Sequence, residues 1–275
     1  MISSSAISAS TYTASVYRSA NDGRPLSKEE PSVAKNENTT SEKSPKAQSS
    51  VALKPSLLLR LRPETLDDCF MPEDVSRRLL RITDAQSVPD TVLYGSAGTG
   101  KSTIANLMLR HFDPANTYKM KAYFHNSRAS DFRGLLQFAV TVGLAPGPKV
   151  CLIEDADCLT RGQQLQIFDM ISRNRSRSCK FLLTTPSIRK IHHKLRSAMA
   201  VFSFEPDKED RAYEVARMQS FVFDKLRSTG EQFDQRRVEA IVAACFPDIR
   251  GILSMIDAYG LDPKSDWPYQ LGPLE

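Results

Sequence analysis

Short apolar runs separated by helix-like segments form the main pattern in the middle of the chain. The runs cover residues 90–94, 149–153, 180–184 and 200–204. Each run is apolar along its length rather than alternating, which is typical of parallel strands covered on both faces. Between the runs, segments such as 101–110 and 163–171 carry apolar residues at helical spacing. The pattern predicts an α/β domain over residues 56–204, in which helices cover both faces of a parallel sheet.

Amphipathic segments follow the last predicted strand. They lie at about 209–228, 235–245 and 248–259 and repeat apolar residues with helical periodicity. We therefore predict a small all-helical lid domain over residues 205–260. Residues 261–275 contain Pro and Gly and are too few for another domain, so we expect a C-terminal tail.

The N-terminal segment, residues 1–55, is rich in Ser and Thr and poor in large apolar side chains. Such a segment buries too little surface to offset the entropy of ordering, so we predict a disordered arm. Its beginning contains Arg18 and no acidic residue before Asp22, which is a weak sign of an organelle transit peptide. An ordinary polar tail is the interpretation that we favour.

Composition narrows the class of protein. The 275 residues are 41% hydrophobic and carry a net charge of +5. No stretch approaches the ~20 consecutive apolar residues of a membrane-spanning helix, so we expect a soluble, cytoplasmic protein without a membrane partner. The five cysteines form no CxxC pair and do not combine with the four histidines at metal-ligand spacing, which predicts reduced thiols.

A glycine-rich turn follows the first predicted strand and precedes a helix. From Gly95 to Ser102 it matches GxxxxGK[ST], in the strand–loop–helix context of a phosphate loop. Backbone N–H groups of such a loop cradle phosphates, the lysine neutralises their charge and the hydroxyl binds Mg²⁺. We predict an ATP site with Lys101 and Ser102 in these roles, whereas the alternative is a turn without a ligand. The predicted nucleotide contacts come from Gly95, Ser96, Ala97, Gly98, Thr99, Gly100, Lys101, Ser102 and Thr103.

Acidic residues end the apolar run at 149–153. This pattern is typical of a strand whose terminal carboxylate faces the Mg²⁺ beside a phosphate loop. We predict that Glu154 binds the metal ion and that Asp155 activates the attacking water. ATPases that have such a strand beside a phosphate loop usually carry Asp before Glu at its end. The reversed order here predicts slowed hydrolysis of ATP. An acidic helix cap after a buried strand is the alternative.

The spacing of these motifs resembles that of the AAA+ ATPase subunits of sliding-clamp loaders, a family that includes the small subunits of replication factor C. The resemblance covers residues 57–259 and includes the Arg-Pro segment 61–72 and the segment 130–139. It implies a P-loop AAA+ fold and places Arg62 and Pro63 at the border of the adenine pocket.

A further part of the resemblance is Phe246-Pro-Asp-Ile-Arg250, which is similar to a sensor 2 motif. The resemblance implies that Arg250 reaches from the lid to the γ-phosphate of ATP. A permanently charged, planar and multidentate side chain suits that role. The alternative is a surface arginine capped by Asp248.

Two positions depart from the family pattern. An ungapped match puts Ala198 where the family has its arginine finger, and Arg196 is the nearest substitute. Where the family often has a sensor 1 asparagine, this chain has Thr185, whose hydroxyl can orient a water, followed by Pro186, which has no donor. The sequence ends about 15 residues after the lid, so we expect no helical collar and leave the mode of assembly open.

Eight Lys and Arg residues and no acid lie between Arg173 and Arg196. Clustered positive charge suits phosphate groups, so this run faces DNA or the nucleotide of a neighbouring subunit, unless it is a solvated loop. Gln163 and Gln164 stand where the family has a glutamine that couples DNA contact to hydrolysis, although a polar helix start looks the same. His192 and His193 are adjacent, which argues against a metal pair.

The resemblance implies an ATPase that uses ATP and Mg²⁺ to open a sliding clamp and place it on primer-template DNA. Its partners are then other loader subunits or further copies of this chain, the clamp and DNA. One alternative is an ATP-binding scaffold with little turnover, which the reversed acids and the missing finger favour. The other is a different AAA+ DNA-remodelling helper.

Overall fold

The computed structural model describes residues 55–84, 88–122, 129–173, 179–206 and 209–261. Nearly all of the predicted N-terminal arm, residues 1–54, lies outside the described residues, as does the predicted tail from residue 262 onward. Both expectations therefore stay predictions.

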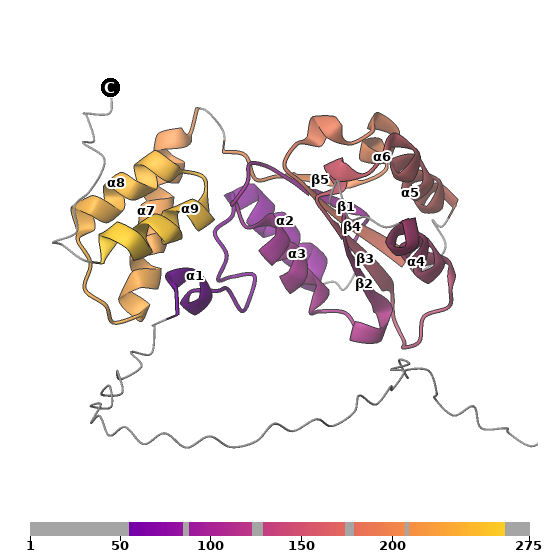
Figure 1. Ribbon diagram of the computed structural model, residues 1–275, viewed down its shortest axis with the longest axis horizontal. Coiled ribbons are helices and arrows are strands. Elements are labelled where there is room, and N and C mark those ends of the chain that lie inside the picture. The colour runs from indigo at the N-terminus through magenta and orange to yellow at the C-terminus, as the bar shows by residue number, and fades with distance from the viewer. Residues whose placement is uncertain (1–54, 85–87, 123–128, 174–178, 207–208, 262–275) are drawn as a thin grey trace, which may run out of the picture. The chain divides into compact units, whose positions relative to one another are not determined.

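A five-stranded parallel sheet forms the centre of the α/β domain (Figure 1). Its strand order is β2-β3-β4-β1-β5. The strands are β1 (Thr91–Tyr94), β2 (Thr117–Lys121), β3 (Lys149–Glu154), β4 (Cys179–Thr185) and β5 (Ala200–Ser203). The four runs predicted from the sequence are confirmed as β1, β3, β4 and β5. The hydrophobic pattern missed β2, because this strand lies at the sheet edge and buries only Met120 along its length.

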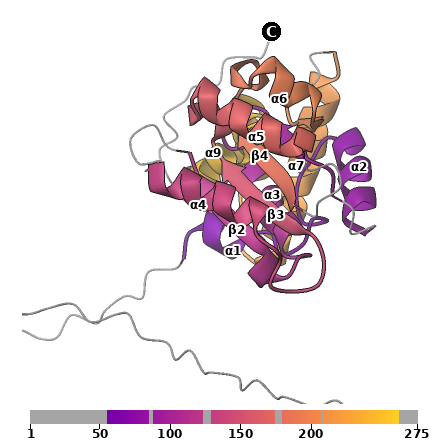
Figure 2. The same ribbon diagram turned by 90° about the vertical axis from the view of Figure 1, so that its right-hand side faces the viewer.

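Helices cover both faces of the sheet, as predicted (Figures 1 and 2). Alternate residues of β3 serve the two faces: Leu152 packs in the cluster with α2 and α3, and Ile153 packs in the cluster with α4 and α5. Both side chains are fully buried. The helices of this domain are α2 (Glu73–Asp84), α3 (Lys101–Leu109), α4 (Ala129–Val140), α5 (Arg161–Arg173) and α6 (His193–Ser197).

Three helices after β5 form the lid: α7 (Arg211–Ser228), α8 (Gln235–Cys245) and α9 (Ile249–Met255). A π-helical turn, Ile256–Gly260, follows α9. Their apolar stripes meet in a cluster of their own, which includes Met218 and Ile241. The short α1 (Leu57–Arg60) adds the fully buried Leu57 to this cluster, so the start of the globular chain packs with the lid.

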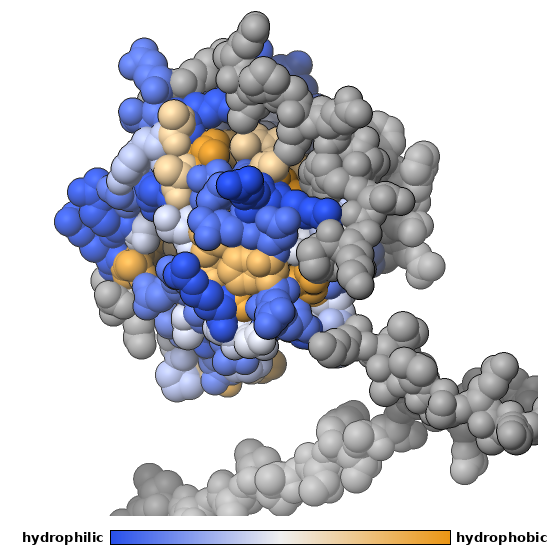
Figure 3. All heavy atoms as spheres, turned by 90° about the vertical axis from the view of Figure 1, so that its left-hand side faces the viewer, coloured by the Kyte–Doolittle hydropathy of each residue, from blue (hydrophilic) through white to orange (hydrophobic). Residues whose placement is uncertain are grey.

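The outer face of the lid is largely hydrophilic, with apolar residues in small patches (Figure 3). Among the described residues, every helix is too short or too polar to cross a membrane.

Candidate nucleotide site

The phosphate loop connects β1 to α3. Its conformation requires glycine at Gly98, where φ is +76° and an added Cβ would lie 1.6 Å from Oδ1 of Asp248. Gly100, with φ +86°, is the N-cap of α3, so the loop leads directly into the helix N-terminus. Backbone N–H groups at a helix N-terminus bind anions, which is the chemistry that phosphates require.

Lys101 is buried and folds back over the loop. Its Nζ donates hydrogen bonds to the Ser96 carbonyl at 2.5 Å and to Oγ1 of Thr99 at 3.1 Å. Burial lowers the pKa of Lys101; the nearby Arg250 charge acts in the same direction, and Asp155 opposes both. Lys101 of α3 therefore lies close enough to Asp155 at the end of β3 and to Arg250 of the lid for both charges to act on it.

Glu154 ends β3 on the sheet face that α3 covers. Glu154 is 9% exposed, and its Oε1 accepts a hydrogen bond from Nδ2 of Asn106 at 2.9 Å. Nζ of Lys121 lies 3.6 Å from its Oε2. Nδ2 of Asn106 also donates to the Ser102 carbonyl at 2.7 Å. Asn106 therefore connects Glu154 to the helical turn that carries Ser102. A carboxylate and a hydroxyl are hard oxygen ligands, so the donor set fits Mg²⁺.

Asp155 follows directly and is held in a left-handed conformation, with φ 55°. Its N–H donates to Oγ1 of Thr184 at 3.3 Å. The pKa of Asp155 is raised, first by burial and then by the carboxylates of Asp157 and Glu154. Strained backbone at a perturbed carboxylate is common at functional sites, which supports Asp155 as the predicted water-activating residue.

The two threonines at the end of β4 have different hydrogen-bond partners. Thr184 contacts Asp155, whereas Oγ1 of Thr185 pairs with the backbone of Ser187 at 3.1 and 3.2 Å. The Thr185 hydroxyl, which the sequence suggested as a water-orienting group, therefore stabilises a turn. Its neighbour Thr184 is the threonine that contacts Asp155.

A cavity of about 340 Å³ lies between the phosphate loop and the lid. This is within the usual size range of small-ligand pockets, roughly 300–1,000 Å³. Lys225 and Asp68 pair at 2.8 Å on its wall, and the Lys225 hydrogen bond lowers the pKa of Asp68 to about 2. The lining combines apolar side chains with basic groups, which suits a purine ring and phosphates. The lining includes Arg62, Pro63, Gly98, Gly100, Thr103 and Arg250.

Arg250 is an exposed residue in the first turn of α9. The preceding Asp248 caps this helix by accepting a hydrogen bond from the Gly251 N–H at 2.8 Å. The cap thus binds the helix backbone, and Arg250 lines the cavity beside the phosphate loop. The structure gathers the predicted contacts Arg62, Pro63, Gly98, Gly100, Thr103 and Arg250 around one space. Sequence reasoning missed Asn106 and Thr184, because only their long-range hydrogen bonds mark them.

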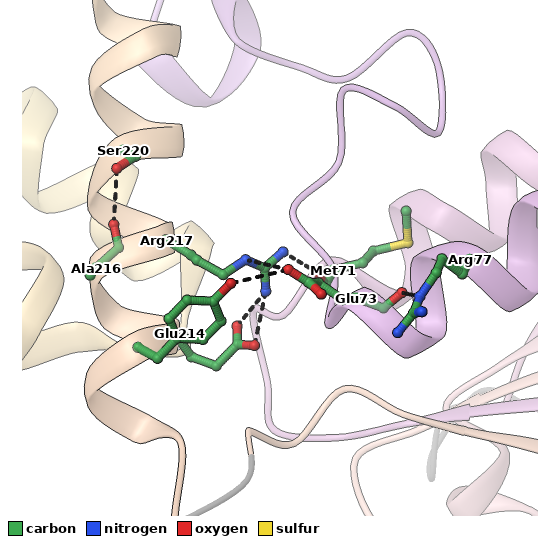
Figure 4. Close-up of polar contacts among 8 residues, drawn as sticks. Met71, Glu73, Arg77, Glu214, Ala216, Arg217 and Ser220 are labelled. Carbon is green, nitrogen blue, oxygen red and sulfur yellow. Dashed lines mark hydrogen bonds and ion pairs between the residues drawn. The ribbon is translucent and has the colours of Figure 1, made fainter.

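A larger groove of about 610 Å³ separates α7 from the segment before α2 (Figure 4). Arg217 is its centre: it donates to both carboxylate oxygens of Glu214, at 2.9 and 2.8 Å, and to the Met71 carbonyl at 3.2 Å. Oε1 of Glu73 lies 3.8 Å from Nε of Arg217, and the centre of the Phe70 ring lies 5.2 Å from the guanidinium carbon. The contacts join the lid to the α/β domain.

The basic run has its own concavity of about 520 Å³. Lys190 pairs with Asp157 at 3.1 Å, and Gln164 is buried there, donating to the Lys190 carbonyl and accepting from the His192 N–H. Gln164 therefore has a structural role at this helix start. Arg175 and Arg177 lie outside the described residues. The basic residues around the concavity are Arg161, Arg189, Lys190 and Arg196.

A comparison with known proteins agrees with this geometry. The family model for "ATPase family associated with various cellular activities (AAA)" matches residues 91–206. The chain is 30% identical to the replication factor C small subunit of Sulfurisphaera tokodaii, over 72% of this chain and 60% of that protein. It is 26% identical to the sliding-clamp-loader large subunit of Enterobacteria phage T4, over 73% of this chain and 63% of that one.

Among solved structures, the Holliday junction branch migration motor RuvB of Thermotoga maritima has a similar fold. Its TM-score is 0.55 at 17% identity, over 71% of this chain and 63% of that one. The sheet order, phosphate loop and lid define a P-loop protein of the AAA+ class. Within that class, the chain is similar in sequence to sliding-clamp-loader subunits. It spans about three fifths of the length of the relatives that it matches.

Proposed function

We propose that the chain binds ATP with Mg²⁺, hydrolyses the ATP, and acts as a subunit of a complex that opens a sliding clamp and places it on primer-template DNA. The observation that carries the proposal is that the phosphate loop and Arg250 of the lid line one cavity, while Asp155 after β3 lies close enough to Lys101 for their charges to interact.

Each residue of the site has a task in this proposal. The backbone of Gly95–Thr103 and the Lys101 ammonium bind the phosphates, while Arg62 and Pro63 border the adenine. Ser102 and Glu154 hold Mg²⁺, which supplies charge neutralisation at the phosphates. Asp155 orients the attacking water and accepts its proton, and Arg250 contacts the γ-phosphate from the lid.

The basic concavity supports DNA as a partner. Arg161, Arg189 and Arg196 line one hollow at the start of α5 and around α6. Clustered guanidinium groups bind backbone phosphates without reading sequence. The same surface supports a subunit contact, because Arg196 is exposed near Ala198 and is the nearest substitute for an arginine finger. We propose that the chain acts at the site of DNA replication in the cytoplasm.

One observation favours a second candidate, an ATP-binding scaffold with little turnover. The order Glu154–Asp155 lengthens the metal-side carboxylate and shortens the one beside the water. A displacement of about 1 Å at a catalytic group can cost about 100-fold in rate.

The deciding experiment measures ATP binding and turnover by the purified chain, alone and with primer-template DNA and the sliding clamp of the same organism. We expect stimulated turnover that disappears in Lys101→Ala and in Asp155→Ala. Tight ATP binding without turnover in any mixture would contradict the proposed ATPase activity and favour the ATP-binding scaffold.

A further inference from the structure

Asn106 of α3 uses both donors and the acceptor of its side-chain amide in one network. Its Nδ2 donates to the Ser102 carbonyl at 2.7 Å and to Oε1 of Glu154 at 2.9 Å. Its Oδ1 accepts a hydrogen bond from Nζ of Lys119 at 2.9 Å. The phosphate-loop helix, the end of β3 and the edge strand β2 therefore meet at a single amide group.

The partners of Asn106 allow only one orientation of this amide. A backbone carbonyl and a carboxylate accept hydrogen bonds, whereas the ammonium group of Lys119 only donates them. Turning the amide by half a rotation would place Oδ1 against the two oxygens and Nδ2 against the lysine, so all three hydrogen bonds would be lost. Lys119, although exposed, therefore fixes which atom of Asn106 faces Glu154.

The register of β2 places two lysines beside this network. Lys119 pairs with Leu152 in the sheet, and Lys121 pairs with Glu154. Residues two apart in a strand point to the same face, and this face is the one that α3 covers, because Leu152 packs in the cluster with α3. Nζ of Lys121 lies 3.6 Å from Oε2 of Glu154. Both carboxylate oxygens of Glu154 therefore have a neighbour that holds them.

The two hydrogens of the Asn106 amide hold the two proposed ligands of Mg²⁺. One hydrogen binds the carbonyl of Ser102 and so fixes the turn that carries the Ser102 hydroxyl. The other binds the carboxylate of Glu154. A carboxylate has about four lone-pair sites, so these contacts leave sites for a metal ion. Asn106 therefore sets the position of one ligand relative to the other.

The cations Mg²⁺ and Ca²⁺ differ in how strongly they depend on ligand position. Mg²⁺ is smaller and requires near-ideal octahedral geometry, whereas Ca²⁺ accepts a more flexible arrangement of oxygen ligands at longer distances. Glutamate has one more rotatable bond than aspartate, so a glutamate ligand needs more restraint to keep one position. The network around Glu154 supplies this restraint.

We propose that Asn106 and Lys119 are positioning residues that adapt the metal site to Glu154 and make it select Mg²⁺ over Ca²⁺. The proposal rests on the function proposed above, in which Ser102 and Glu154 hold the metal ion. Asn106 acts on both ligands directly, whereas Lys119 acts through Asn106 by fixing its amide. Neither residue belongs to the described lining of the nucleotide cavity, so their effect on nucleotide contacts is indirect.

The experiment measures cation selectivity rather than turnover. Titration of the full chain and a fluorescent, non-hydrolysable ATP analogue with Mg²⁺ or Ca²⁺ gives an apparent dissociation constant for each cation. Asn106→Leu removes the amide, Lys119→Met removes the donor to Oδ1, and Lys119→Arg keeps a donor there. Lys194→Met removes the charge of an exposed lysine on α6 and is the matched control. Thermal midpoints without metal report whether each variant is folded.

We expect Asn106→Leu to raise the dissociation constant of Mg²⁺ about tenfold, because groups that orient metal ligands have effects of this size. The constant for Ca²⁺ should rise less than about threefold, since its coordination is more flexible. Lys119→Met should shift the ratio of the two constants in the same direction, and Lys119→Arg should restore it. Combining Asn106→Leu with Lys119→Met should add nothing to Asn106→Leu alone. Lys194→Met should resemble the unmodified chain.

Equal weakening of Mg²⁺ and Ca²⁺ binding in Asn106→Leu would overturn the inference, because a merely structural contact has that effect. Additive effects of Asn106→Leu and Lys119→Met would contradict the action of Lys119 through Asn106. If Asn106→Leu fails to fold, Lys119→Met and Lys119→Arg carry the test, and an unchanged ratio in Lys119→Met overturns the inference. An unmodified chain that binds the analogue with neither cation contradicts the proposed function itself.

Discussion

Asp248 performs two tasks at one position. Its carboxylate caps α9 through the Gly251 N–H, and it also lies against Gly98 of the phosphate loop. The negative charge acts on Lys101, which places it within electrostatic reach of the phosphate site. A carboxylate beside an anion site opposes the binding of phosphates. A single residue thus caps the helix that carries Arg250 and places a negative charge beside the phosphate loop.

The first prediction removes this charge and keeps the cap. Asn is as good an N-cap as Asp, so Asp248→Asn should leave the stability of the lid unchanged and lower the dissociation constant of ATP several-fold. Titration with ATP and Mg²⁺ measures the change. Asp234→Asn is the matched control, because Asp234 caps α8 by accepting from the Arg236 N–H at 3.0 Å. An equal effect of both variants, or weaker binding in Asp248→Asn, would argue against the repulsion.

Strand β3 is anchored at both of its ends by side-chain hydrogen bonds. Its first residue, Lys149, donates to backbone carbonyls at the end of α4, and its last residue, Glu154, contacts the phosphate-loop helix through Asn106. Every residue of the strand is buried, so the side chains on it are held in place by packing on both sheet faces. The packed strand therefore cannot shift to compensate for the reversed order of Glu154 and Asp155 at its carboxyl end.

The second prediction concerns that order. Glu154→Asp together with Asp155→Glu restores the usual sequence of the two acids, with the shorter carboxylate toward Mg²⁺ and the longer one toward the water. We expect kcat for ATP to rise by up to about 100-fold with little change in ATP affinity. Steady-state turnover and ATP titration measure both quantities. If kcat stays constant or falls, carboxylate length does not limit hydrolysis.

At the scale of the whole molecule, polar contacts join the lid to the α/β domain, both on the wall of the candidate nucleotide cavity and in the groove beside α7. Arg217 contacts Met71 and Glu73, and Lys225 pairs with Asp68. Tyr213 donates to Glu73 at 3.2 Å. Asp68 and Met71 lie on the segment between α1 and α2, which also carries Arg62 and Pro63, and Glu73 is the first residue of α2. The position of the lid and the shape of the cavity therefore depend on the same short segment.

The third prediction tests this attachment. Arg217→Met keeps the stem but leaves Glu214, whose side chain is 14% exposed, without its guanidinium partner. We expect the free energy of unfolding to fall by about 1–3 kcal/mol and ATP binding to weaken. Arg227→Met on the same helix breaks only the exposed pair with Asp224, so it should change stability by less than about 1 kcal/mol. Urea unfolding and ATP titration distinguish the two variants, and equal effects would contradict the attachment.

Much of the fold was predictable because its signals are local or periodic. Runs that are apolar along their whole length identify β1, β3, β4 and β5, which are covered on both faces. The edge strand β2 escaped because it buries only Met120, and α2 was overlooked although its buried residues Val75 and Leu79 have helical spacing. Of the site, the phosphate loop and the acids of β3 were visible as motifs, whereas Asn106 and Thr184 are ordinary residues until the fold places them.

By itself, the sequence determined the phosphate loop, the burial of the central strands and the helical lid, since glycine positions and apolar spacing act over a few neighbouring residues. Only the tertiary structure decided that Asp248 lies against Gly98, that Arg217 donates to the Met71 carbonyl and that Asn116 donates to the Ala145 carbonyl. These contacts join residues far apart in the chain. Their geometry depends on how sheet and lid pack, and a hydrogen bond forms only where packing brings donor and acceptor within about 3 Å.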